Sequence, residues 1–137
     1  LAEASSVPIA VNQDHGADYE SAVECIRAGF SSIMVDRSQL PYEENVAQVK
    51  EIVKIAHAVG VSVEAELGHV GNANNYDVDR DAALTDPEMA KKFIEETGID
   101  CLAVAIGTAH GAYNVGQKPY LDYERLQEIK KVTNNSH

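Results

Sequence analysis

The chain has 137 residues, 45% of them hydrophobic, and no low-complexity stretch, which predicts one folded domain with a hydrophobic core. Its formal net charge of -11, from 11 Lys+Arg against 22 Asp+Glu, argues against a nucleic-acid-binding surface. No apolar run approaches the roughly 18–20 residues that span a bilayer, and no charged-then-apolar leader opens the sequence. We therefore expect neither secretion nor a membrane anchor.

In chain order, the predicted elements are a strand at 7–11, a helix at 18–28, a strand at 32–35, a helix at 41–59, a strand at 61–64, a helix at 86–98, a strand at 101–106 and a helix at 122–132. Gly29 and Gly60 follow the first two helices as stop signals. Asp86 suits the N-cap of the third helix and Pro87 its first turn.

The two cysteines indicate a reducing compartment. Cys25 and Cys101 both stand among apolar residues, so we expect two buried, reduced thiols instead of a disulfide. A cytoplasmic location is the corresponding expectation.

The alternation of strands and helices predicts parallel βαβ units, and the nearly continuous apolar strands fit a sheet that is covered on both faces. Periodicity alone does not separate a β/α barrel from an open, doubly wound sheet. Polar residues follow all four strands, however, and this favours a barrel, where every strand end faces one shared site. They are Gln13-Asp14-His15, Asp36-Arg37-Ser38, Glu64 with Glu66, and Thr108 with His110.

Two His-Gly pairs at strand ends suggest a metal site. His15 follows Asp14 in Asn-Gln-Asp-His-Gly, and His110 stands in Gly-Thr-Ala-His-Gly. An ordinary turn explains either segment by itself, but neutral imidazole is the commonest metal ligand. The glycines would let backbone N–H groups approach a bound oxyanion.

Asp36, Glu64 and Glu66 supply carboxylates on the two strands in between. Strand alternation places Glu64 and Glu66 on the same face. A carboxylate inside a barrel needs a partner or a metal; the alternative for each is a solvated strand-end charge. His57 is expected to interact with a helix C-terminus, and His69 is either a substrate contact or a surface residue.

Four blocks carry a resemblance that covers essentially the whole chain. They are Val-Pro-Ile-Ala-Val-Asn-Gln-Asp-His-Gly at 7–16, Ser-Ile-Met-Val-Asp-Arg-Ser at 32–38, Val-Ser-Val-Glu-Ala-Glu-Leu-Gly at 61–68 and Ala-Ile-Gly-Thr-Ala-His-Gly at 105–111. In order and spacing the chain resembles the class II, zinc-dependent fructose/tagatose-bisphosphate aldolases. The resemblance implies a (β/α)8 TIM barrel, of which residues 1–137 would form one partial domain with about strands 3 to 6.

The resemblance also implies site residues. His15 and His110 match two of the family's three zinc-binding histidines, and Asp14 matches the catalytic aspartate. Asp36 and Glu66 match carboxylates near the zinc that can hold a displaced or second metal. Gly111 matches a glycine near the substrate phosphate and a monovalent cation. These assignments imply a glycolytic lyase that cleaves fructose 1,6-bisphosphate, with tagatose 1,6-bisphosphate as the alternative because no residue here decides between the sugars.

Two departures from the family pattern bear on activity. In the loop after Gly68, Asn74 stands roughly where the family has a proton-transferring acid. Either Tyr76 or Asp77 substitutes for it, or the chain belongs to a subfamily with different loop chemistry. The third family histidine belongs to a Leu-His-Gly block that this chain lacks. We therefore expect a poor aldolase from these residues alone; alternatively, two copies could associate into a barrel-like dimer. A homo-oligomer (dimer or tetramer) is the expected assembly. The alternatives are a non-catalytic half-barrel that binds a metal or a partner, and a flavin- or phosphate-binding barrel of another family.

Overall fold

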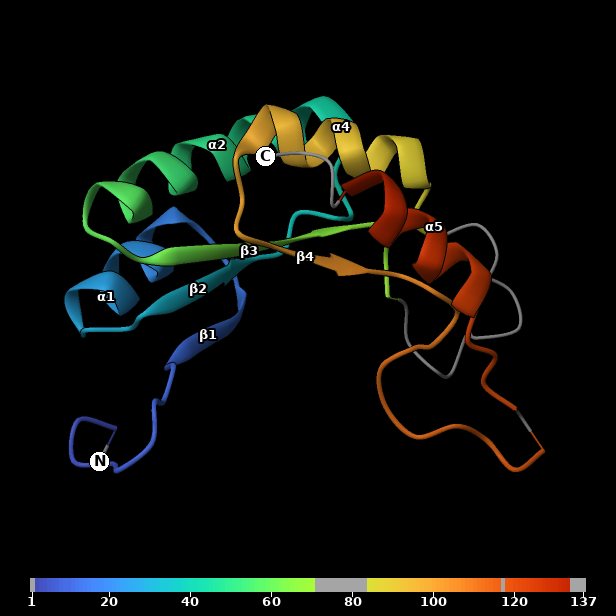
Figure 1. Cartoon of the computed structure of the whole chain (residues 1–137), viewed down its shortest axis with the longest axis horizontal. Helices are drawn as coiled ribbons and strands as arrows, with labels where there is room; N and C mark the ends of the chain where they lie inside the picture. Colours follow the sequence, from blue (N-terminus) through green and yellow to red (C-terminus); the bar gives the residue numbers. More distant parts are fainter. Residues whose placement is uncertain (1, 71–83, 117, 134–137) are drawn as a thin grey trace. The chain divides into compact units, whose positions relative to one another are not determined.

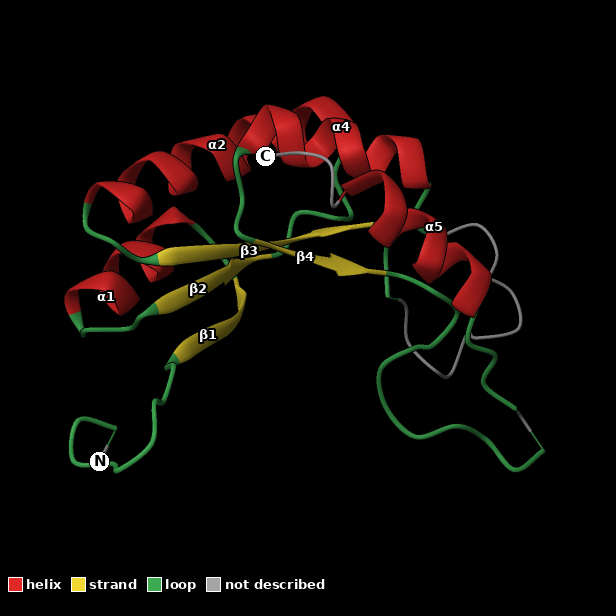
Figure 2. Cartoon of the chain, in the orientation of Figure 1, coloured by secondary structure: helices red, strands yellow, loops and turns green. Residues whose placement is uncertain are grey.

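The computed structural model describes residues 2–70, 84–116 and 118–133, in which strands and helices alternate (Figures 1 and 2). The elements are β1 (Asn12–Gly16), α1 (Tyr19–Arg27), β2 (Ser32–Val35), α2 (Tyr42–Ala58), β3 (Ser62–Leu67), α4 (Pro87–Thr97), β4 (Cys101–Val104) and α5 (Tyr123–Thr133). The sheet has the order β1-β2-β3-β4, and β2 pairs in parallel with both β1 and β3. This arrangement confirms the predicted parallel α/β class with four βα units.

The first strand lies later in the chain than predicted. We expected residues 7–11, but β1 is Asn12–Gly16, and Val7 and Ile9 are 61% and 51% exposed. The short β2 explains the shift, because it begins at Ser32, which lies opposite Asn12. The Val11 carbonyl oxygen still accepts hydrogen bonds from the Ser31 and Ser32 N–H groups at 3.1 Å, but residues 7–10 precede this point. The strand prediction at 32–35 is confirmed by β2.

The helices begin and end close to where the sequence predicts. The Asp18 carboxylate accepts a hydrogen bond from the Ser21 backbone N–H, and the Ser21 hydroxyl lies 3.2 Å from the Asp18 nitrogen, which completes a capping box on α1. Asp86 caps α4 through the Met89 N–H at 2.9 Å. Gly29, after α1, adopts a positive φ of 88°, as a C-terminal glycine does.

The chain divides into two compact units. The first contains Leu1–Ala65 with Thr97–Leu102, and the second contains Glu66–Glu96 with Ala103–His137. In the first unit the buried side of α2 and the strands β2 and β3 supply the core, in which Val49, Ile52, Ile33 and Val63 are at most 2% exposed. In the second unit Phe93, Ala90, Ala105 and Ile129 are buried.

The cysteine prediction is correct in one respect and wrong in another. Both cysteines are free, but Cys25 is half-buried and Cys101 is exposed. Cys101 is the first residue of β4, where the strand has only just begun to pack. Partial burial, together with the Glu64 and Asp100 carboxylates, still raises the pKa of the Cys101 thiol. Among the described helices, none has the length and apolar character needed to cross a membrane.

Candidate metal centre

An irregularity in β1 positions the first two candidate residues. Gln13 pairs with Ile33 and Gly16 with Val35, so three steps along β1 correspond to two along β2. The extra residue forms a bulge that contains Asp14 and His15, and His15 has a φ of 45°. Adjacent residues of a regular strand point to opposite faces. Here Asp14 Oδ1 lies 3.9 Å from His15 Nε2, so the bulge brings both functional groups together.

The carboxyl end of β2 supplies a partner for the imidazole. His15 Nδ1 lies 3.0 Å from Asp36 Oδ2, which is within hydrogen-bonding distance. The His15 side chain is 38% exposed and that of Asp36 only 18%, whereas that of Asp14 is 84% exposed. The imidazole is thus accessible but oriented, and Asp14 is open to a reactant.

Asp36 is held as a carboxylate. Partial burial would raise its pKa, but hydrogen bonds from the Ser38 backbone N–H and hydroxyl, with the contribution of His15, hold the pKa below its usual value. The Ser38 donors lie 3.0 and 2.7 Å from Asp36 Oδ1, which leaves Oδ2 for His15. Each carboxylate oxygen therefore has its own partner.

Glu66 supplies the third group at this edge. It follows Ala65, which pairs with Val35 of β2, so the strand register carries Glu66 to the level of Asp36. Glu66 is only 2% exposed, and its Oε1 accepts a hydrogen bond from the Val70 N–H at 3.1 Å. One ligand atom from each of His15, Asp36 and Glu66 lies within 4.8 Å of the other two. An imidazole nitrogen with two carboxylates is a donor set that suits divalent first-row metals, including zinc.

The loop after β4, in the second unit, carries the other two predicted residues. His110 and Gly111 are both exposed, and Gly111 has a φ of 95° with no atom within 4 Å of where a Cβ would stand. The Tyr113 hydroxyl anchors the residue before His110, because it lies 2.7 Å from the Ala109 nitrogen and 3.2 Å from its carbonyl oxygen. The backbone around His110 is therefore held from within its own loop.

The predicted loop contacts Asn74, Tyr76 and Asp77 lie outside the described residues. His69 is half-buried at the start of that loop.

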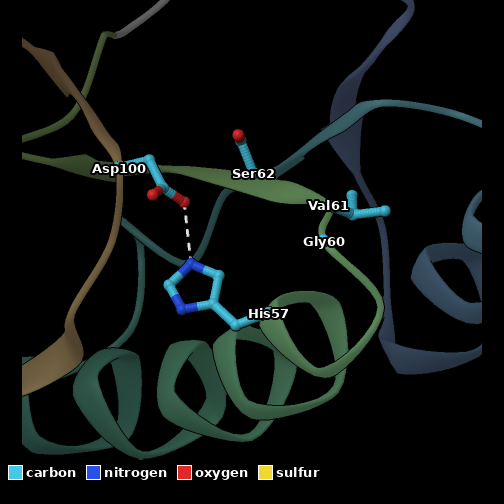
Figure 3. A pocket seen from close by; sticks show the side chains of 5 residues that line it. All are labelled: His57, Gly60, Val61, Ser62 and Asp100. Atoms are coloured by element: carbon cyan, nitrogen blue, oxygen red, sulfur yellow. Dashed lines mark hydrogen bonds and ion pairs between the residues drawn. The ribbon is translucent and has the colours of Figure 1, made fainter.

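His57 has a partner that the sequence did not suggest. It lies in the last turn of α2, as expected for a residue near a helix C-terminus, but its Nε2 also lies 2.8 Å from Asp100 Oδ2 (Figure 3). The same oxygen accepts a hydrogen bond from the Val63 N–H at 2.7 Å. His57 and Asp100 therefore connect α2 to the start of β3 in the first unit. With Gly60, Val61 and Ser62 they line a shallow pocket.

Arg37 is the residue beside the site whose contacts the sequence did not reveal. It stands between Asp36 and Ser38 among the strand-end polar residues, which gives no hint of where its long side chain goes. The structure directs its guanidinium to the backbone carbonyls of Gly16 and Asp36 and to the Gln48 side chain. Tyr113 was missed for the same reason, since its contact is with a loop backbone.

Comparison with known proteins gives a consistent result. A family model described as "Fructose-bisphosphate aldolase class-II" matches residues 1–136. A fructose-bisphosphate aldolase from Thermus caldophilus is 48% identical over 134 residues, which is 96% of this chain and 44% of that protein. A fructose-bisphosphate aldolase from Giardia intestinalis is 53% identical over 129 residues, covering 93% of this chain and 40% of that protein.

Solved structures agree with the sequence matches. The YdjI aldolase from Escherichia coli K12 superimposes with a TM-score of 0.81 at 36% identity, covering 96% of this chain and 44% of that one. A fructose-bisphosphate aldolase from Campylobacter jejuni gives a TM-score of 0.72 at 30% identity, covering 98% and 43%. The chain thus spans less than half the length of these relatives, and its four βα units correspond to part of their TIM barrel.

Proposed function

Because the chain belongs to the class-II fructose-bisphosphate aldolase family, we propose that the protein catalyses the reversible aldol cleavage of a ketose 1,6-bisphosphate. The proposed substrate is fructose 1,6-bisphosphate, and the products are dihydroxyacetone phosphate and glyceraldehyde 3-phosphate. The observation that carries the proposal is the family match over residues 1–136, together with Asp14 and Asp36 on either side of His15.

We assign metal binding to His15, Asp36 and Glu66, with His110 as a further ligand, and we propose zinc as the metal. The group of one imidazole and two carboxylates supports this assignment. When bound, zinc supplies Lewis-acid stabilisation of the negative charge that bond cleavage leaves on the dihydroxyacetone phosphate half. The Nδ1–Asp36 contact supports an orienting role as well, since a histidine ligand is commonly held through its other nitrogen.

Asp14 is the proposed general base. In the cleavage direction its carboxylate takes the proton of the substrate C4 hydroxyl, whose O–H electron pair becomes the new C4 carbonyl bond. The C3–C4 bond breaks, and its electron pair forms the enediolate of dihydroxyacetone phosphate. In the condensation direction the same Asp14 returns the proton to the C4 oxygen. The 84% exposure of its side chain supports this role, because a general base must reach the substrate.

The proton exchanged at C3 requires another residue. Asn74 has an amide side chain, which cannot serve as an acid at neutral pH. We propose Tyr76 or Asp77 of the same loop in its place.

Gly111 is the proposed contact for a substrate phosphate and a monovalent cation. Its positive φ and the open space on its Cβ side support a close approach of backbone to a bound oxyanion. A cytoplasmic location and a homo-oligomeric state are further proposals, and analytical sedimentation tests the second of them.

The experiment that tests the catalytic assignment is the substitution Asp14→Asn. General acid–base help is worth about 10²–10⁴-fold, so we expect cleavage of fructose 1,6-bisphosphate to fall by about that factor while zinc remains bound. Glu20→Gln removes another exposed carboxylate, in the first turn of α1, and serves as the matched control. Near-full activity in Asp14→Asn would refute the role of Asp14. Parallel assays with tagatose 1,6-bisphosphate decide the sugar, and zinc binding without cleavage of either sugar would favour the non-catalytic alternative.

A further inference from the structure

We propose that Arg37 is a positioning residue that holds the β1 bulge in the geometry that metal binding requires. The inference rests on the proposed function, because it concerns the same centre. It adds a residue that is neither a ligand nor a proton carrier. Its basis is the set of contacts that the Arg37 side chain makes within the first unit.

The bulge needs support because its backbone is strained. His15 has a φ of 45°, a left-handed conformation that is strained for a non-glycine residue and persists only where the surroundings enforce it. Gly16, directly after it, is packed so closely that a Cβ would lie 2.6 Å from the Met34 carbonyl oxygen. The backbone of 15–16 can therefore relax only by moving away from β2.

Arg37 opposes that movement. One guanidinium nitrogen, Nη1, donates to the Gly16 carbonyl at 3.2 Å and to the Asp36 carbonyl at 2.8 Å. The same side chain thus ties the residue after the bulge on β1 to the end of β2. The first carbonyl belongs to Gly16, the residue after His15. The second belongs to Asp36, whose carboxylate contacts the His15 imidazole.

The guanidinium is itself anchored on a helix. Arg37 Nε donates to Gln48 Oε1 at 2.7 Å, so α2 fixes the direction of the side chain. Only the planar fork of arginine can present donors to a side-chain oxygen on one side and to two backbone carbonyls on the other. A lysine ammonium at this position would keep the charge but could not keep all three contacts.

The charge of Arg37 and its positioning of the bulge have opposite effects on the affinity for a metal. As a fixed positive charge near the centre, Arg37 should weaken the binding of a cation, so its removal would strengthen metal binding if charge dominated. If positioning dominates, its removal weakens binding, by about 10-fold on the scale typical of residues that orient metal ligands. The sign of the change separates the two effects.

The experiment measures zinc affinity by competition with a chromophoric chelator for the wild-type chain and for Arg37→Gln, Arg37→Lys and Gln48→Ala. We expect about 10-fold weaker zinc binding for Arg37→Gln, a similar loss for Arg37→Lys because charge alone is insufficient, and a smaller loss for Gln48→Ala. The control is Arg27→Gln, which removes an exposed arginine from the last turn of α1 and should bind zinc as the wild type does. Visible spectra of the Co²⁺-loaded chains report the ligand geometry directly and should change only for the Arg37 and Gln48 variants.

Thermal unfolding of the metal-free chains separates positioning from general stability. If Arg37→Gln fails to fold, Arg37→Lys and Gln48→Ala carry the test. Unchanged or tighter zinc binding in the folded Arg37 and Gln48 variants, with an unchanged Co²⁺ spectrum, would overturn the inference. A wild-type chain whose zinc binding is insensitive to His15→Ala would instead refute the proposed metal site itself, so the two failures are distinguishable.

Discussion

At the scale of single residues, the side chains of the candidate metal centre are oriented by separate hydrogen-bond partners. Asp36 uses one oxygen for Ser38 and the other for His15, so its orientation is fixed before any metal arrives. Asp14 is exposed and lies near the other imidazole nitrogen. The β1 bulge therefore carries both the proposed ligand, His15, and the proposed base, Asp14, and Asp36 at the end of β2 contacts the ligand.

Gly107 has a steric requirement in the second unit that can be tested against a matched glycine. Gly107 has a φ of 112°, and an added Cβ would clash with the Tyr120 carbonyl oxygen. We predict that Gly107→Ala lowers the free energy of unfolding by about 2 kcal/mol or more, since the backbone strain and the clash add. Gly29→Ala carries only the strain, because its φ is also positive but no atom lies within 4 Å of the Cβ position.

Urea denaturation of the two variants provides the measurement for these glycines. If Gly107→Ala lowers the free energy of unfolding no more than Gly29→Ala does, Tyr120 moves to accommodate the Cβ without a measurable loss of stability.

At the scale of secondary structure, the sequence predicted the kind and order of the described elements but not the local geometry of the site. Capping residues such as Asp86 and stop signals such as Gly29 act within a few residues of themselves, so the helix ends could be predicted. The β1 bulge could not be, because it depends on the register between β1 and the four-residue β2. The contacts of Arg37 were hidden for a similar reason, since they join residues 11 and 21 positions apart.

The pairing of His57 with Asp100 provides a pH-dependent contribution to stability. Partial burial would raise the Asp100 pKa, but hydrogen bonds from the Val63 N–H and His57 outweigh it and hold the pKa below its usual value. A lowered pKa in the folded state means that the carboxylate stabilises the fold fully above about pH 4. The contribution is lost as the pH falls through the folded-state pKa.

We therefore predict that Asp100→Asn lowers the free energy of unfolding at pH 7 by at most about 1 kcal/mol, because the side chain is 45% exposed and the charge is screened. The difference from wild type should shrink below pH 4, where the wild-type residue also becomes neutral. Urea denaturation at pH 7 and pH 3 measures both values, with Glu95→Gln on α4 as the control. A difference that is constant with pH would mean that the charge of Asp100 does not contribute.

At the scale of the whole molecule, the sequence identified the family and the parallel α/β class because both depend on features spread along the entire chain. Four blocks in order, and four strands that alternate with helices, do not depend on the placement of any one side chain. Metal binding, in contrast, depends on the geometry of the ligands as well as on the residues that supply them. The family match extends over residues 1–136, while the chain spans 44% of the length of its Thermus caldophilus relative.

The proposed mechanism makes cleavage dependent on a bound metal. The rate of fructose 1,6-bisphosphate cleavage should be measured before chelation, after removal of metal with a chelator, and after zinc is added back. We predict that activity disappears with the metal and returns with zinc, because the negative charge of the enediolate has no other stabiliser of comparable strength in this mechanism. Cleavage that persists in the chelator-treated protein would contradict it.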